Sequence, residues 1–580
     1  MTALNSTDVA AEARVTLERA RAHLVSRQDP AGWWKGELRT NVTMDAEDLL
    51  LRQFLGILRA DELDEAARWI RSQQRADGTW ANFEGGPADL STTIEAYTAL
   101  RLAGDDAGAP HLRTARRYIL EGGGLEASRV FTRIWLALFG EWSWDELPAM
   151  PPELVLLPKW VPLNVYDWAC WARQTIVPIT VVVTLRPVRP LPFHLTELRT
   201  GTTPPVRAGF VPAAFRMLDR VLKGYHRLPF HPLRATAFAR AAEWILARQE
   251  ADGGWGGIQP PWVYSILALH LQGYPLDHPA MAAAIGGLDG FLVREKTPDG
   301  VVRRLEACQS PVWDTCLALI ALLDAGASGT EPELRRALDW MLGEEIRVRG
   351  DWAVQRPQLE PSGWAFEFAN DGYPDVDDTA EVVLALQRLR APDRPDIDAA
   401  LDRSTRWTLG MQSADGGWGA FDADNDRRLV EKLPFCDFGA VIDPPSADVT
   451  AHAVEMLAAR GLADADATRR GVQWLLDAQE TDGSWFGRWG ANYVYGTGAA
   501  VPALVAAGVA ANSLPVRRAV RWLEQHQNDD GGWGEDLRSY TDDEWRGRGA
   551  STASQTAWAL LALLAAAPGS SAVAHGVRYL

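Results

Sequence analysis

Residues 474–485 read WLLDAQETDGSW, a phrase that recurs along the chain. Each copy ends a helical pattern with a Trp, a Gln, an Asp-Gly turn and a closing Trp. The Gln amide can bond exposed backbone at a neighbouring helix end while the closing Trp stacks over it. The phrase therefore predicts helix pairs that are tied together. Copies run from Trp69 through Gln73 to Trp80, from Trp244 to Trp255, from Trp407 to Trp418 and from Trp522 to Trp533, with a weaker copy from Trp340 to Trp352.

A second repeat places a Thr in the first turn of an expected helix and a Leu seven positions later. A Thr there, with an Ala- and Leu-rich continuation, suits an inner helix packed closely against its neighbours. Inner helices that alternate with the Trp-Gln helices make helical hairpins in a solenoid or closed ring, so the sequence predicts an all-α fold. The pairs are Thr43/Leu50, Thr93/Leu100, Thr315/Leu322, Thr379/Leu386, Thr450/Leu457, Thr497/Leu504 and Thr556/Leu563, with Trp262/Leu269 as a variant.

Length and composition narrow the classes of protein. At 580 residues the chain is too long for one core, which favours two large domains. A net charge of −18 excludes a basic nucleic-acid surface. The four cysteines form no CxxC pair, so neither a zinc site nor a disulfide framework is indicated. The N-terminus lacks a signal-peptide pattern, and no run of about eighteen apolar residues is present that could span a membrane.

Residues 374–380, PDVDDTA, place three carboxyl groups at the start of a helical pattern. Asp378 is expected to be the N-cap, with Glu381 as its capping-box partner. A single acid would be explained as a helix cap. Three crowded carboxylates repel one another, however, and another task usually holds them together.

Alignment of the inner helices on the template Thr brings polar and aromatic residues to equivalent positions. If these helices run parallel, their first turns share one rim and can face one cavity. Two simpler interpretations stay open: Thr92 and Glu95 form a capping-box pattern, and His452 could pair with Asp448 four residues earlier. Two residues before the Thr position lie Asp377, Asp448, Trp313, Tyr495 and Pro260, and two residues after it lie Glu95, His452 and Glu381.

Acids, a histidine and 26 tryptophans together suit a particular kind of chemistry. Neighbouring carboxylates keep a proton on one group near neutral pH, and a hydrogen bond from a protonated His strengthens that acid. Aromatic faces stabilise cations without acting as nucleophiles. The combination favours protonation of a very weak base followed by cyclisation through carbocations.

Several of these motifs resemble those of bacterial squalene–hopene cyclases. They are DVDDTA at 375–380, the repeated Q-x-x-D-G-G/S-W phrase, PFCDFG at 434–439, SWFGRWGANYVYGTG at 484–498 and GIQPPW at 257–262. The resemblance covers nearly the whole chain. It implies two (α/α) barrel domains, a homodimer attached to one face of the membrane on its cytoplasmic side, and a cavity that folds squalene without metal or cofactor.

The resemblance also implies domain boundaries and site residues. One domain would comprise residues 1–20 and 310–580, and the other residues 21–309 with a membrane-associating segment near 207–227. Asp377 would donate the proton, with Asp375 and Asp378 in support and His452 hydrogen-bonded to the acid. The cavity would be lined by Trp171, Trp313, Phe366, Phe421, Trp489 and Tyr495, and its polar end would contain Gln259, Pro260, Glu47, Glu95 and Arg129.

Two departures from the family pattern stand out. Phe421 replaces a usual Tyr, which is expected to shift the product distribution rather than remove activity. In addition, Tyr579-Leu580 matches Trp522-Leu523, the opening of another repeat. We therefore expect a further segment, with a glycine-rich turn and several Phe and Tyr residues, in a complete family member.

Three alternatives remain at this stage. A class II diterpene cyclase also uses DxDD, but it needs a diphosphate site, and no Lys/Arg cluster lies near the acids in the sequence. A prenyltransferase β-subunit needs zinc ligands, to which Cys436, Asp437 and His452 are a poor match. A non-catalytic helical scaffold leaves Asp377 and His452 unexplained.

Overall fold

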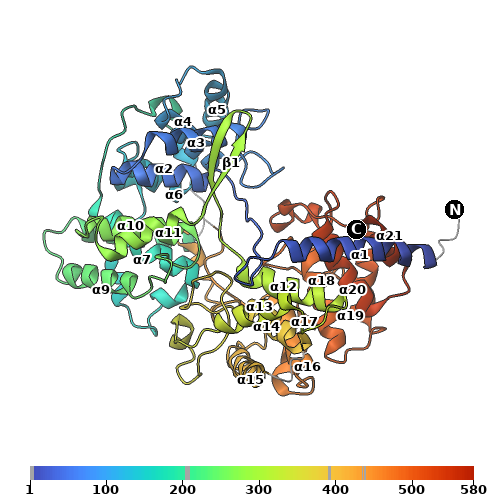
Figure 1. Ribbon diagram of the computed structural model, residues 1–580. Helices are drawn as coiled ribbons and strands as arrows, with labels where there is room; N and C mark the ends of the chain where they lie inside the picture. The colour runs from blue at the N-terminus through green and yellow to red at the C-terminus, as the bar shows by residue number, and fades with distance from the viewer. Residues whose placement is uncertain (1–5, 203–209, 390–393, 434, 437–438) are drawn as a thin grey trace. The chain divides into compact units, whose positions relative to one another are not determined.

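A computed structural model describes residues 6–202, 210–389, 394–433, 435–436 and 439–580 (Figure 1). These residues form two compact units. Unit 1 comprises Met1–Gly36, Ser310–Asp426 and Asp443–Leu580, and unit 2 comprises Glu37–Gln309 and Arg427–Ile442. The domain boundaries expected from the sequence stay a prediction.

Unit 1 is all-α. Its helices are α1 (Ser6–Ser26), α12 (Pro311–Asp324), α13 (Pro332–Gly343), α14 (Val376–Leu389), α15 (Pro395–Gly410), α16 (Ala447–Ala459), α17 (Asp466–Asp477), α18 (Tyr493–Ala506), α19 (Leu514–Gln525), α20 (Ala553–Ala566) and α21 (Ser571–Tyr579). Short 3-10 helices lie at Asp351–Val354, Leu537–Tyr540 and Asp543–Trp545.

Unit 2 adds one small sheet. Its helices are α2 (Thr43–Leu55), α3 (Ala60–Ser72), α4 (Leu90–Leu102), α5 (Pro110–Glu121), α6 (Val130–Leu138), α7 (Cys170–Leu185), α8 (Phe210–His226), α9 (Arg234–Leu246), α10 (Gln259–Leu271) and α11 (Pro279–Asp289). The antiparallel hairpin pairs β1 (Leu292–Thr297) with β2 (Gly300–Leu305). The 3-10 helices are Leu125–Ala127, Trp144–Glu146, Pro152–Leu156, Val165–Asp167, Thr196–Leu198 and Val430–Lys432.

Inner and outer helices alternate along unit 1. The even-numbered helices α12 to α20 pack each against the next, and each is followed by an outer helix that packs on it. Residues 493–501 at the start of α18 are all buried, whereas α19 buries only Val516, Ala519, Trp522 and Leu523. Continuous burial is typical of a helix enclosed by neighbours, and burial at every third or fourth residue is typical of a helix with one solvent face. The predicted all-α fold of helical hairpins is confirmed.

The repeated Gln and Trp form a clamp of four hydrogen bonds. Gln479 Nε2 donates to the carbonyl oxygens of Gly483 and of Pro515 in the next outer helix, both at 2.9 Å. Trp485 Nε1 donates to the carbonyl oxygen of Leu475 at 2.7 Å. The backbone N–H of Trp485 donates to Thr497 Oγ1 at 3.0 Å. The template Thr is therefore the acceptor that ties each closing Trp to the following inner helix.

In the first copy of the repeat, the Gln that forms the clamp differs from the one expected from the sequence. Gln74, not Gln73, donates to Gly78 and His111, at 2.8 and 3.2 Å. Gln73 instead accepts from Arg39 at 2.5 Å. In each copy that contains the Gln, it lies six residues before the closing Trp, so the spacing from that Trp identifies it.

In the weaker copy, which has Glu345 in place of Gln, the expected closing residue Trp352 is wrong. Trp364 takes that role, with Nε1 donating to the carbonyl oxygen of Met341 at 2.7 Å and its backbone N–H to Thr379 Oγ1 at 3.0 Å.

One further copy was missed at the N-terminus. Gln28 Nε2 donates to the carbonyl oxygens of Gly32 and Glu333, both at 2.8 Å, and Trp34 Nε1 donates to Leu24 at 2.7 Å. The sequence between Gln28 and Trp34, DPAGW, lacks the Asp-Gly pair, which is why the pattern did not find it. This copy ties the end of α1 to α13.

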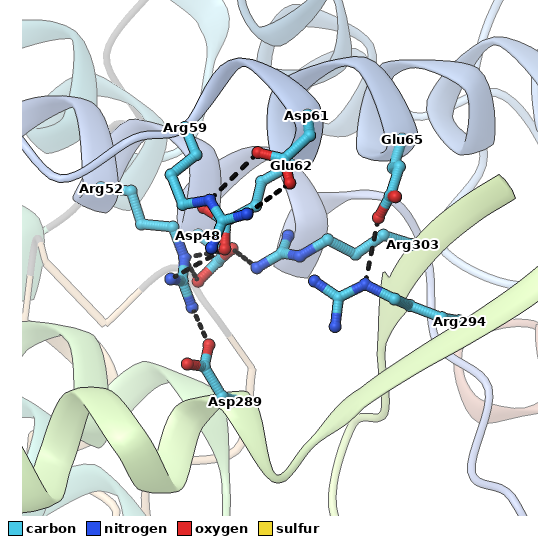
Figure 2. Close-up of polar contacts among 9 residues, drawn as sticks. All are labelled: Asp48, Arg52, Arg59, Asp61, Glu62, Glu65, Asp289, Arg294 and Arg303. Carbon is cyan, nitrogen blue, oxygen red and sulfur yellow. Dashed lines mark hydrogen bonds and ion pairs between the residues drawn. The ribbon is translucent and has the colours of Figure 1, made fainter.

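A buried ionic network joins the hairpin of unit 2 to α2 (Figure 2). Asp48 accepts from Arg52 Nε at 3.0 Å and from Arg303 Nη2 on β2 at 2.6 Å. Arg52 Nη2 also donates to Asp289 at 2.6 Å. Asp48 and Arg303 are fully buried, so loss of Asp48 would remove the ion-pair partner of an arginine in the core.

We expect Gln479→Ala to lower the free energy of unfolding by about 1–3 kcal/mol, because two backbone carbonyls lose their shared donor. Denaturant titration measures the change. Gln473→Ala is the control: this exposed Gln donates to Asp477 on its own helix, and its loss should change stability by less than about 0.5 kcal/mol. Equal effects of the two substitutions would contradict a structural role for the clamp.

Candidate active site

The acidic motif begins α14, and Asp375 caps the helix. Asp375 Oδ1 accepts the backbone N–H groups of Asp377 at 2.6 Å and Asp378 at 3.3 Å. The assignment of Asp378 as N-cap is therefore wrong. The helix already begins at Val376, so Asp378 lies within its first turn. Glu381 is not a capping-box partner either, since it lies near His452 instead.

Asp377 and His452 form the hydrogen bond that the family resemblance implied. His452 Nδ1 lies 2.6 Å from Asp377 Oδ1, and both side chains are buried. The alternative pairing of His452 with Asp448 is not made. Asp448 accepts from Ser446 Oγ at 2.5 Å and from the backbone N–H of Trp489 at 2.7 Å. The histidine on α16 thus bonds to the acid on α14.

Burial and crowding set the protonation of the acids. Burial raises the pKa of Asp375 well above its usual value, and the charge of Asp377 raises it further. The pKa of Asp378 is raised well above its usual value by burial and by the charges of Asp375 and Asp377. Burial lowers the pKa of His452, but the carboxylates of Asp377 and Glu381 outweigh it and raise that pKa to about 10. Burial and crowding therefore favour the protonated form of Asp375 and Asp378, and the neighbouring carboxylates favour the imidazolium form of His452.

Aromatic rings surround His452. The ring centroids of Trp313 on α12, Tyr495 on α18 and Trp558 on α20 lie 6.0, 6.3 and 6.0 Å from that of the histidine. Tyr495 and Trp558 contact each other edge to face at 4.8 Å. Each inner helix of unit 1 therefore contributes at least one side chain to the group around His452.

Trp558 was missed by the sequence analysis. It lies two residues after Thr556, the template position that His452 occupies after Thr450 and Glu381 after Thr379. The signal that identified those two residues was thus present for Trp558 as well.

Phe421 and Trp489 form a second aromatic pair in unit 1. Their rings lie 5.8 Å apart, edge to face, and Trp489 is 43% exposed. The loop that carries Phe421 is held by Asp443, whose Oδ2 accepts the backbone N–H groups of Phe421 and Asp422 at 2.7 and 2.9 Å. No sequence pattern pointed to Asp443. Phe366 is half-buried in the loop before α14.

The residues of the expected polar end lie together in unit 2. Glu47 and Glu95 are buried, and the pKa of Glu47 is raised well above its usual value by burial and by the charge of Glu95, while Arg129 lowers it. Gln259 begins α10, followed by Pro260, and its buried side-chain amide lies at the carboxyl group of Glu47, whose pKa it lowers by hydrogen bonding. A buried amide in this position is suited to bind water or a polar ligand group.

Glu95 is not part of a capping box. Asp89 caps α4 by accepting from the N–H of Thr92, and Glu95 accepts a hydrogen bond from Thr132 on α6. The side chain therefore points across to a neighbouring helix. The capping-box interpretation of Thr92 and Glu95 is wrong.

Trp171 lies in unit 2, at the start of α7. Its Nε1 donates to the carbonyl oxygen of Ala440 at 2.9 Å. Pro434, Asp437 and Phe438 of the PFCDFG motif lie outside the described residues.

The expected membrane segment is described in part. Residues 207–209 lie outside the described residues, whereas α8 begins at Phe210. Met217 and Val221 on α8 are 58% and 59% exposed, and Phe230 after the helix is 74% exposed. Among the described helices none is long and apolar enough to cross a membrane.

Two family models and several known proteins match nearly the whole chain. The family model described as "Squalene-hopene cyclase N-terminal domain" matches residues 17–297, and "Squalene-hopene cyclase C-terminal domain" matches residues 309–580. The chain is 50% identical to a squalene–hopene cyclase of Alicyclobacillus acidocaldarius, over 97% of this chain and 90% of that protein. It is 40% identical to a squalene–hopene cyclase of Zymomonas mobilis, over 97% and 88% of the two chains.

A solved structure is also similar. The ent-copalyl diphosphate synthase from Streptomyces platensis has a TM-score of 0.50 and 20% identity, over 98% of this chain and 92% of that chain. At this identity the likeness shows the fold alone.

We expect Asp375→Ala to lower the free energy of unfolding by about 0.5–2 kcal/mol, because the cap of α14 is lost. Asp378→Asn should instead raise the free energy of unfolding at pH values above the acid range. In the folded protein the pKa of Asp378 is raised well above its ordinary value of 3.8. As pH rises from 3.8 towards the folded-state pKa, the free energy of unfolding of wild type therefore falls, whereas the variant, which lacks this carboxyl group, does not lose stability from this cause.

Denaturant titrations from acid to neutral pH measure both effects. Asp375→Asn is the matched control, since its amide oxygen can still accept the two N–H groups. If Asp378→Ala, which removes any capping oxygen at that position, destabilised the protein as much as Asp375→Ala, the assignment of the cap to Asp375 would be wrong.

Proposed function

The chain belongs to the squalene–hopene cyclase family, and we propose that it protonates squalene and cyclises it through carbocations to pentacyclic hopene and hopanol. The observation that carries this proposal is the buried hydrogen bond between Asp377 and His452, set among protonated acids and aromatic rings. An alkene is a very weak base, so its protonation needs an acid made stronger by a positive neighbour.

Asp377 is the proton donor in this proposal. The π electrons of the terminal alkene take the carboxyl proton, which leaves Asp377 as a carboxylate and the substrate as a tertiary cation. Each following double bond attacks the cation and passes the positive charge onward. The imidazolium of His452 stabilises the carboxylate as it forms, through the 2.6 Å contact between Nδ1 and Oδ1.

Aromatic side chains hold the cationic stages. The faces of Trp313, Phe421, Trp489 and Tyr495 attract positive charge without forming bonds to it. Burial raises the pKa of Tyr495 well above its usual value, and the charge of Asp377 raises it further. Its hydroxyl therefore stays neutral and does not trap the cation as a phenolate.

On the family resemblance alone, we propose that Glu47, Glu95 and Gln259 take part in the final step of the reaction. Loss of a proton from the last cation gives hopene, and capture of water with loss of a proton gives hopanol. Glu47 and Glu95 are buried carboxyl groups that would accept the proton in their ionised form, and burial raises the pKa of both, which makes each carboxylate a stronger base. The buried amide of Gln259, beside Glu47, would hold the water.

The protein would act at the cytoplasmic surface of the cell membrane. The exposed apolar residues Met217, Val221 and Phe230 support contact of α8 and the segment after it with lipid. Squalene is an apolar substrate that dissolves in that lipid. A homodimer stays a prediction that rests on the family resemblance alone.

We expect detergent-solubilised or membrane-bound protein to convert squalene to hopene and hopanol, detected by mass spectrometry of the apolar extract. Asp377→Asn removes the donated proton and should lower the rate at least about 100-fold. Asp466→Asn, at an exposed acid on α17, is the control and should leave the rate unchanged. Turnover of geranylgeranyl diphosphate in place of squalene would support a diterpene cyclase, and no product from either substrate would support a scaffold.

We also expect the double substitution of Met217 and Val221 by Glu to weaken binding to lipid vesicles at least about tenfold, since two apolar side chains lose their burial in lipid. Vesicle flotation measures the bound fraction. Leu514→Glu is the control, because Leu514 is 62% exposed but lies on α19 of unit 1. Equal losses in the two proteins would count against a lipid-binding role of α8.

A further inference from the structure

His452 lies between two carboxyl groups of the same helix. Asp377 and Glu381 are one turn apart on α14, so their side chains share a face. Nδ1 of His452 lies 2.6 Å from Asp377 Oδ1, and Nε2 lies 3.8 Å from Glu381 Oε1. The second distance is that of an ion pair without a hydrogen bond, and Nε2 has no hydrogen-bond partner among the described residues.

The proposed function places opposing demands on the charges of Asp377 and His452. The proton donor works as a neutral carboxylic acid, so Asp377 carries no negative charge before the reaction. The histidine must nevertheless be cationic to strengthen that acid. The charge that keeps it cationic must then come from a group other than Asp377.

We propose that Glu381 is a positioning residue that keeps His452 doubly protonated while Asp377 carries the proton for the substrate. The negative charge that balances the imidazolium lies on Glu381 in the loaded state and on Asp377 after proton transfer. With Nε2–H directed at Glu381, Nδ1–H is directed at Asp377. This inference rests on the proposed function for its catalytic meaning.

Protonation of Asp377 favours ionisation of Glu381, as the proposal requires. Burial raises the pKa of Glu381 to about 7, His452 lowers it, and the charges of Glu455 and Asp377 raise it. When Asp377 takes up a proton, one of the charges that oppose ionisation of Glu381 disappears. Glu381 therefore ionises more readily in the state in which its charge is needed.

The other groups that face His452 do not replace Glu381. The helices α12, α18 and α20 present Trp313, Tyr495 and Trp558, and α12 also carries the buried thiol of Cys316 near Glu381. On α16 itself, Asp448 is held by Ser446 and the backbone of Trp489.

Glu455 is the remaining acid near His452. It lines a pocket of about 320 Å³ together with Arg388 and Gln387, and burial raises its pKa while His452 and Arg388 lower it in part. Glu455 is half-buried at that pocket, and Arg388 acts on both Glu455 and Glu381. Glu381 is the acid within ion-pair distance of Nε2.

The decisive experiment measures the pKa of His452 by NMR of ¹⁵N-histidine-labelled protein, with the signal assigned by its loss in His452→Gln. Asp377→Asn serves as the background, because the neutral amide mimics the protonated acid. Addition of Glu381→Gln should lower the pKa of His452 by about one to three pH units. A fall of less than one pH unit would overturn the proposal.

The matched control is Glu344→Gln in the same background. Glu344 is a half-buried glutamate of unit 1 whose pKa is raised by burial and by Asp371, and its loss should leave the pKa of His452 unchanged. Because this measurement needs no turnover, its failure is distinct from a failure of the proposed function.

A kinetic test separates positioning from a merely structural role. An epoxide is easier to protonate than an alkene, so Glu381→Gln should slow squalene more than 2,3-oxidosqualene, with the loss in kcat rather than in KM. Glu381→Asp keeps the charge and should recover part of the squalene rate. Equal losses for the two substrates, or no recovery by Asp, would overturn the proposal.

Discussion

The hydrogen bond from the backbone of each closing Trp to the template Thr sets the register of the inner helices of unit 1. Each inner helix receives this bond in its first turn, so the same template positions come to the same level in successive helices. The side chains around His452 lie at those positions. The bonds join Trp34 to Thr315, Trp364 to Thr379, Trp418 to Thr450, Trp485 to Thr497 and Trp533 to Thr556.

This register explains why the sequence predicted so much of the site. The contact between Asp377 and His452 joins residues 75 apart. The template placed both residues at one rim, and the family resemblance implied that they pair. The helical hairpins were likewise evident from two repeats. Where a signal was missed, as at Trp558 and Gln28, the residue still obeyed the same spacing.

Other features depend on which groups a side chain contacts, and a periodic sequence pattern does not predict those contacts. Asp375 and Asp378 are both short acids near the helix start, and only the position of the first helical residue decides which of them caps it. Asp443 holds the loop of Phe421 from a segment about twenty residues away, with no repeat to relate the two. Glu95 fitted a capping box in sequence, yet its carboxyl group crosses to α6.

The cap by Asp375 has a consequence for the acidity of its neighbours. A helix N-terminus carries a partial positive charge, which favours ionised carboxylates and so would strip protons from acids placed there. Asp375 occupies the free N–H groups of Asp377 and Asp378, so the field of the α14 macrodipole acts first on a carboxyl group that does not donate. The first turn of a helix, ordinarily a poor place to store a proton, is thereby made compatible with an acid that must hold one.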